Sequence, residues 1–172
     1  MFSIERHVVG SYRTNCYVLT SAGQAIVIDP GDEGDRLIRE LGEADVSHIV
    51  LTHCHSDHIG AVNELAERYG AIVCVGRDDA VGVADPHLSG FDEEGSDYRV
   101  ERVDRLLDDG DALAWGEDRL EVIATPGHTP GSICLYDPGT ATMFTGDTLF
   151  ADGIGRTDFV RGDAKAMRAT CA

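Results

Sequence analysis

The sequence has little positive charge, few aromatic residues and no long apolar run. Among 172 residues, 14 Lys and Arg face 31 Asp and Glu, for a net charge of −17, and Lys165 is the only lysine. Proteins that bind nucleic acids or anionic membranes use clustered basic residues, so this charge balance argues against both partners. The acidic residues are spread along the whole chain. This favours a solvated acidic surface, suited to high salt, over a cationic partner.

Other absences concern targeting and redox chemistry. No apolar stretch approaches the roughly 20 residues of a membrane span, and Met1–Arg6 lacks the pattern of a secretory signal. The five cysteines are odd in number and form no Cys-x-x-Cys pair, which favours free thiols in a reducing compartment. The sequence therefore predicts a cytoplasmic globular chain, with residues 1–172 in a single domain. The near-absence of lysine is similar to the composition of salt-adapted archaeal proteins.

Apolar periodicity predicts an α/β domain in which outer helices cover sheets. Strands are expected at Phe2–Val9, Cys16–Thr20, Ala25–Asp29, His48–Leu51, Ala71–Val75, Arg119–Ala124, Ser132–Tyr136 and Thr142–Thr145. Helices are expected at Asp35–Leu41, Ile59–Tyr69 and Asp163–Thr170, the last with Asp163 as its N-cap. The acidic stretch Arg77–Asp111 has weak periodicity and is predicted to be a short helix followed by an irregular excursion.

The most informative segment is a histidine cluster between a predicted strand and a predicted helix. His53 and His55 alternate in extended chain and so face one point, and the turn into the helix brings Asp57 and His58 to it. Imidazole and carboxylate together suit zinc, iron or manganese. The alternative is a set of solvated loop histidines, but three of the seven histidines within six residues favour a metal site. By the same alternation Cys54 points away, into the core.

Two later motifs follow predicted strands. Pro126-Gly127-His128 places a histidine in a rigid turn, and Gly146-Asp147 places an acid after a buried strand. Each alone is typical of an ordinary turn. Their order after the histidine cluster favours a shared site.

Together these motifs resemble the metallo-β-lactamase superfamily, and within it the glyoxalase II-like (hydroxyacylglutathione hydrolase-like) hydrolases. Val27–Gly31 and Gly155-Arg156-Thr157-Asp158 also fit the family pattern. The resemblance covers nearly the whole chain. It implies a four-layer αββα sandwich with a site for two divalent metals, zinc first, with iron or manganese as alternatives.

The resemblance also implies a role for each motif residue. The first metal would be held by His53, His55 and His128, the second by Asp57 and His58, with Asp147 bridging both. Asp57 would also orient the attacking hydroxide, and Asp29 matches an acid that orients a histidine ligand from behind.

One feature departs from the family. The family has a further histidine after the position of Asp147, whereas this sequence has none after His128 and ends at Ala172, where a helix begins. We therefore expect the last strand and helix to be missing, the second metal site to be weakened, and an exposed sheet edge to permit self-association. No spacing supports Cys171 as a substitute ligand.

The predicted function is hydrolysis of a small-molecule thioester by a metal-bound hydroxide, as in glyoxalase II. The first alternative is a mononuclear iron persulfide (sulfur) dioxygenase using His53, His128 and Asp147. The second is an inactive remnant with one weak metal site.

Overall fold

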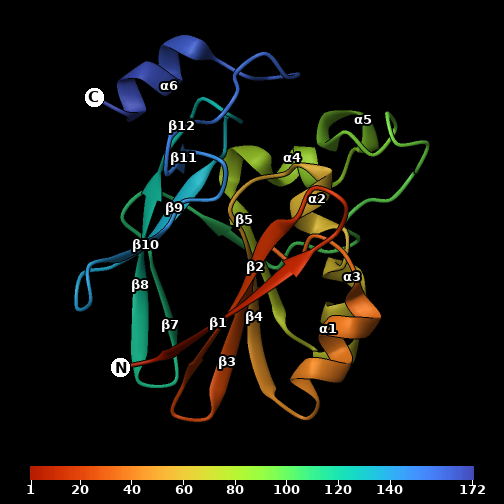
Figure 1. Cartoon of the computed structure of the whole chain (residues 1–172), viewed down its shortest axis with the longest axis vertical. Coiled ribbons are helices and arrows are strands. Elements are labelled where there is room, and N and C mark those ends of the chain that lie inside the picture. The colour runs from red at the N-terminus through yellow and green to blue at the C-terminus, as the bar shows by residue number, and fades with distance from the viewer.

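The computed structural model describes residues 1–172, and most of its strands form two sheets that face each other (Figure 1). The larger sheet has, in spatial order, β1 (Ser3–Val9), β2 (Thr14–Ser21), β3 (Gln24–Ile28), β4 (Asp45–Leu51), β5 (Ile72–Gly76) and β6 (Arg105–Leu107). The smaller sheet has β10 (Thr142–Phe144), β9 (Ile133–Asp137), β8 (Asp118–Ala124) and β7 (Ala112–Trp115). A separate hairpin joins β11 (Leu149–Phe150) to β12 (Gly153–Ile154).

The larger sheet changes character along its width. Its first three strands are antiparallel, whereas β3, β4, β5 and β6 run parallel to one another. Carboxyl ends of parallel strands meet at one sheet edge, which is where sites form in such sheets. Asp29, His53 and Asp79 follow the ends of β3, β4 and β5, so they meet at that edge.

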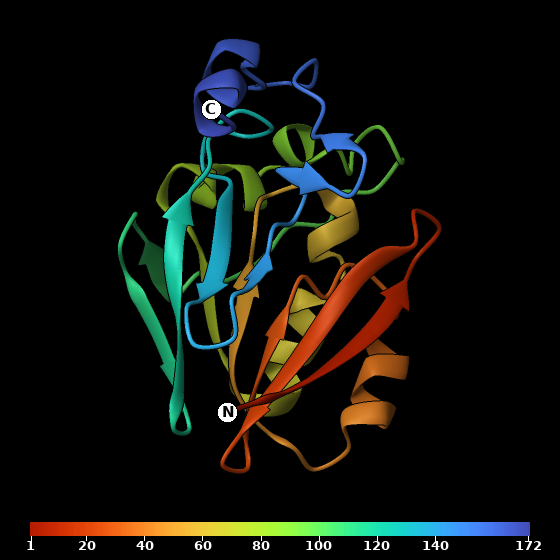
Figure 2. The same ribbon diagram turned by 60° about the vertical axis from the view of Figure 1, so that its left-hand side comes forward.

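Helices lie on one side of the larger sheet and along this edge. Figure 1 shows α1 (Gly34–Leu41) and α3 (Val62–Tyr69) on the side away from the smaller sheet. The short helices α2 (Ser56–Ile59), η1 (Arg77–Asp79), α4 (Ala80–Val83) and α5 (Pro86–Ser89) lie toward the edge itself, and α6 (Ala164–Thr170) closes the chain at the same end (Figure 2).

Strand alternation produces two separate cores. Val18 and Val27 belong to the core under α1 and α3, whereas their neighbours Leu19 and Ile26 belong to the core between the sheets. Residues two apart on a strand share a face, so both faces of the larger sheet are apolar and buried. This confirms the predicted mixed α/β sandwich.

The smaller sheet is buried on one face only. In β7, Leu113 and Trp115 are buried while Ala112 and Ala114 are exposed, and no helix covers that outer face. Its outermost strands, β7 and β10, each leave one edge unpaired in the sheet. Self-association at such an edge stays a prediction.

The prediction of one continuous helix over Ile59–Tyr69 is wrong. The structure has two helices, because the backbone N–H groups of Gly60 and Ala61 donate to the carbonyls of Gly31 and Pro30 at 3.0 and 2.9 Å. A Cβ at Gly60 would also overlap the Gly31 carbonyl. These two hydrogen bonds tie the end of α2 to the loop after β3.

The interpretation of Arg77–Asp111 as irregular is wrong at its end. β6 pairs in parallel with β5, and only Leu107 of its three residues is buried, so the strand has almost no periodic signal. Strand β7 and the exposed β11–β12 hairpin were likewise not predicted.

The last helix begins as predicted. Asp163 caps it by accepting from the backbone N–H groups of Lys165 and Ala166 at 2.7 and 3.1 Å. The helix also holds the preceding turn, since Asp163 N–H donates to Gly127 O at 2.8 Å and Thr170 Oγ1 donates to Pro126 O at 2.8 Å. α6 therefore supports the loop that carries His128.

Candidate metal centre

Three loops at the same end of the sheets bring the predicted ligands together. The loop after β4 and helix α2 supply four side chains, the turn after β8 supplies one and the loop after β10 supplies one. They fall into two groups that we call the three-histidine group (His53, His55, His128) and the mixed group (Asp57, His58, Asp147).

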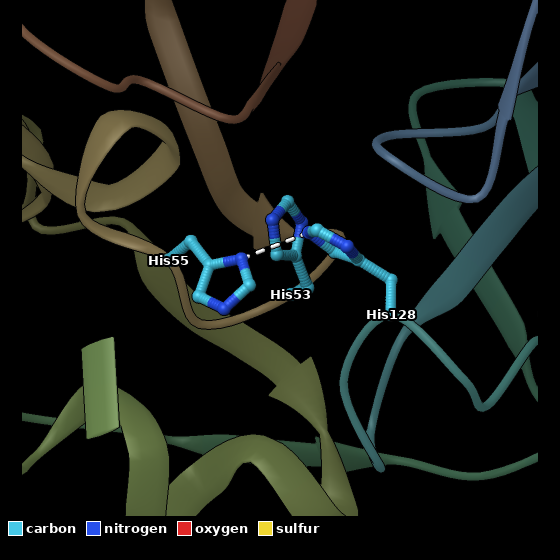
Figure 3. A group of neighbouring side chains, drawn as sticks. All are labelled: His53, His55 and His128. Atoms are coloured by element: carbon cyan, nitrogen blue, oxygen red, sulfur yellow. Dashed lines mark hydrogen bonds between the residues drawn. The ribbon is translucent and has the colours of Figure 1, made fainter. Parts of the chain in front are cut away.

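The three-histidine group is tightly gathered. Figure 3 shows the rings of His53, His55 and His128 converging, with His55 Nδ1 lying 2.8 Å from His128 Nε2. The ring of His53 lies 4.9 and 4.8 Å from those of His55 and His128, centroid to centroid. Their nitrogens all fall within 4.8 Å of one another, close enough to bind one ion.

Neighbouring groups determine which ring nitrogen carries the proton. His128 Nδ1 lies 2.7 Å from the carbonyl of Arg156, which can only accept, so Nδ1 is protonated and Nε2 keeps its lone pair. Thr52 Oγ1 donates to Asp29 and so accepts from His53 Nδ1 at 3.1 Å. His53 Nε2 is then a free lone pair, and it is buried without a hydrogen-bond partner.

The mixed group lies beside it. His58 Nε2 is 3.2 Å from Asp147 Oδ1 and 3.5 Å from Asp57 Oδ2, and its Nδ1 lies 2.9 Å from Asp29 Oδ2. The other oxygen of Asp147 is 3.5 Å from His128 Nε2. Asp147 therefore turns one oxygen toward each group, as a bridging ligand does.

The two groups differ in their protonation. Burial lowers the pKa of His53 well below its usual value and that of His55 to about 3, helped by the neighbouring imidazoles. Burial also opposes the charged form of His58, but Asp29, Asp147 and Asp57 outweigh it and raise its pKa well above the usual value. His53 and His55 are thus neutral before any metal arrives, while His58 is protonated among carboxylates.

The residues fit a divalent metal. An unpaired, fully buried imidazole nitrogen is costly to leave without a partner, and a metal ion satisfies it. The donor set of imidazoles and carboxylates suits zinc, iron and manganese. Support behind the ligands is also in place, because Thr52, Arg156 and Asp29 hold the far nitrogens of three histidines.

Asp79 is a supporting residue that the sequence analysis missed. Its carboxylate is fully buried and accepts from Cys54 N–H at 3.0 Å, Thr129 Oγ1 at 2.6 Å and Gly131 N–H at 2.9 Å. It therefore joins the loop of His53 and His55 to the loop of His128. Its position just after a buried strand, like that of Asp29, was the available signal.

Phe159 was also not predicted as a neighbour of the ligands. The Phe159 ring lies edge-on to His55 and His128, with centroids 5.0 and 5.7 Å apart, and the Arg156 guanidinium lies 4.3 Å above it. Asp158 holds that guanidinium by two hydrogen bonds of 2.9 Å. This segment forms a wall beside the three-histidine group.

The remaining cysteine predictions can be placed. Cys54 is buried in the core under α1 and α3, facing away from the ligands as expected. Cys171 lies at the end of α6, where its sulfur is 3.8 Å from that of Met167, and it belongs to neither ligand group. The five cysteines are free thiols, four of them buried.

Comparison with known proteins agrees with this geometry. The family model of the metallo-beta-lactamase superfamily matches residues 9–170. The chain belongs to the metallo-β-lactamase superfamily. The family groups metallo-hydrolases, so the predicted class of protein is confirmed.

Two relatives and one solved structure illustrate the likeness. The chain is 36% identical to the probable metallo-hydrolase YqgX of Bacillus subtilis, with 94% of this chain and 78% of the relative covered. It is 33% identical to the hydroxyacylglutathione hydrolase GloC of Haemophilus influenzae, with 96% and 80% covered. The di-iron-bound structure of TTHA1623 superimposes with a TM-score of 0.86 at 30% identity, covering 97% of this chain and 83% of the other.

The likeness to TTHA1623 shows that this metallo-β-lactamase architecture holds two metal ions in a relative. For the chain itself, no helix is long and apolar enough to cross a membrane.

Proposed function

We propose that this chain hydrolyses thioesters with the help of divalent metal. The observation that carries the proposal is His53 Nε2, a buried nitrogen without a partner that lies among the ligand atoms of both groups. The three-histidine group would hold one ion and the mixed group a second, with Asp147 turned toward both.

The reaction needs a nucleophile and a polarised carbonyl. A divalent metal supplies both when bound, because it makes a coordinated water acidic near neutral pH and draws electrons from a carbonyl oxygen. Asp57 is the residue we assign to orient the nucleophile. Thr14 Oγ1 donates to its Oδ2 at 2.7 Å, which fixes the carboxylate and leaves its other oxygen as an acceptor.

A thioester is favoured over other substrates on chemical grounds. A thiolate leaves without being protonated, which suits a centre whose histidines are occupied as ligands. The relative GloC, named a hydroxyacylglutathione hydrolase, supports the same class of substrate.

The test begins with metal-free protein that is reloaded separately with Zn²⁺, Fe²⁺ and Mn²⁺ in high salt. Thiol release from S-lactoylglutathione and from a butyryl thioester is then followed. We expect metal-dependent turnover, lowered by about 100-fold or more in Asp57→Asn and unchanged in the exposed control Asp97→Asn.

Three results would contradict the proposal. They are failure to retain metal, β-lactam hydrolysis without thioester hydrolysis, and no turnover of either thioester. Oxygen uptake on a persulfide by the iron form alone would support the dioxygenase instead.

A further inference from the structure

A cavity of about 570 Å³ opens beside the metal centre. Its inner end is formed by ligand side chains, among them His55, Asp57, His128 and Asp147. A substrate whose carbonyl meets the centre can place its remaining groups along the other walls of this cavity. A second cavity, of about 500 Å³, opens on Asp57, His58 and Asp147 from the side of Arg13. If the proposed function holds, the walls of the first cavity determine which thiol carriers the site accepts.

One wall is apolar. Phe150, Ile154, Phe159 and Val160 line the cavity, and each is between 40% and 48% exposed. Exposed apolar side chains gathered next to a reactive centre favour an apolar group on the ligand. Within this wall, Phe159 is held in place by its contacts with the rings of His55 and His128.

Another wall carries negative charge. The segment after α5 places Glu93 and Glu94 in the lining, and Glu94 is held by Ser56 Oγ, which donates to it at 2.9 Å. Asp57 and Asp147 would be neutralised as metal ligands, whereas Glu93 and Glu94 line the cavity and neither forms a salt bridge. This wall therefore repels an anionic group.

The positive side chains of the lining are already compensated. Arg156 forms two hydrogen bonds of 2.9 Å with Asp158, and His87 Nδ1 lies 2.8 Å from Asp92. A carboxylate or phosphate on a substrate would have to break one of these pairs to find a partner. No uncompensated cation among the lining residues is available to bind it.

We infer that the site takes thioesters that have an apolar portion and a neutral or cationic thiol carrier, and discriminates against anionic carriers. Repulsion by Glu93 and Glu94 is the physical reason. This repulsion weakens as salt screens it, whereas contact with the apolar wall does not.

The test uses three butyryl thioesters that share the acyl group and have small carriers of different charge. They are butyrylthiocholine (cationic), S-butyryl-N-acetylcysteamine (neutral) and S-butyryl-3-mercaptopropionate (anionic). We expect kcat/KM to be at least about tenfold lower for the anionic ester, with the difference narrowing as KCl rises.

A double variant assigns the effect to its source. In Glu93→Gln/Glu94→Gln the anionic ester should gain at least threefold relative to the neutral one, while the exposed control Glu101→Gln leaves the ratio unchanged. Equal rates for the three carriers, a preference for the anionic one, or an unchanged ratio in the double variant would overturn the inference.

Binding provides a readout independent of turnover. The uncleavable thioether analogues of the three esters should compete for the metal-loaded site in the same order of charge. If no ester is hydrolysed but the analogues bind in this order, the proposed function fails while the inference holds. If the analogues bind without regard to charge, the inference fails.

Discussion

The three-histidine group and the mixed group lie side by side, but they differ in burial and in the residues that hold their histidines. His53 and His128 are 1% and 2% exposed and are held from behind by neutral acceptors. In the mixed group, the side chains of Asp57 and Asp147 are each 27% exposed, and the one histidine is tied to a buried acid. The first group is a buried, pre-arranged nitrogen site, and the second is an open, oxygen-rich one.

This difference sets an order of metal binding. Lowered pKa values keep His53 and His55 neutral, so a metal meets free lone pairs. The raised pKa of His58 means that a metal must displace a proton from a charge-paired imidazole. The three-histidine group should therefore fill first, and the mixed group should bind more weakly.

Removing one histidine from each group tests this order with the largest effect. His128→Ala should abolish tight metal binding and lower kcat/KM by more than about 100-fold, because the buried set loses a nitrogen ligand. His58→Ala should retain one tightly bound ion. His48→Ala, on β4 and outside both cavities at the centre, is the matched control. Metal content after dialysis and thioester kinetics give the answer, and loss of both ions in His58→Ala would contradict the order.

Two buried acids offer a finer test. Asp79 joins the two loops of the three-histidine group, whereas Asp29 contacts His58 directly and His53 only through Thr52. Asp79→Asn places an NH2 group opposite one of the two backbone N–H donors and should destabilise the chain by roughly 1.5–3 kcal/mol, with weaker binding at the three-histidine group. Asp29→Asn should weaken the mixed group instead, through His58. Thermal unfolding and metal titration of both variants measure this, and identical metal profiles would refute the division.

Gly127, which directly precedes His128, allows a steric test with a smaller expected effect. A Cβ at Gly127 would overlap Met167 on α6, and Gly127 has a positive φ of 147°. Gly127→Ala should lower stability by about 1–3 kcal/mol and loosen the three-histidine group. An unchanged Tm would show that α6 does not support the loop. Gly153→Ala, where the added Cβ meets nothing within 4 Å, is the control.

The smallest effect concerns the helix cap. Hydrogen bonds from the backbone N–H groups of Ala166 and Lys165 lower the pKa of Asp163. A lowered pKa adds stability above the unfolded-state value, and this is lost as pH falls through the folded-state value. Asp163→Asn should thus reduce Tm slightly at pH 7, since Asn also caps well, and the difference should vanish in acid, below the folded-state pKa of Asp163. A difference that grows in acid would contradict this.

The sequence predicted those parts that local chemistry determines. Alternation placed His53 and His55 on one side and Cys54 on the other, and the capping preference of Asp163 located the start of α6. The convergence of all six predicted ligands on one end of the sheets also follows the predicted strand ends.

What escaped prediction depends on tertiary contacts. Asp79 follows a buried strand as Asp29 does, but its role depends on the end of β5 lying next to the turn of His128, and the sequence around Asp79 does not show that contact. The break between α2 and α3 arises from Pro30 and Gly31, far away in sequence. β6 has one buried residue and is defined by its pairing with β5 rather than by periodicity.

Titration of the metal-free chain with Zn²⁺ against a competing chelator tests the central claim most directly. We predict one tight site, at the three-histidine group, and a second, at the mixed group, that binds Zn²⁺ at least about tenfold more weakly. Thioester turnover should appear only as metal binds. Two equally tight sites, or no tight site at all, would contradict this prediction.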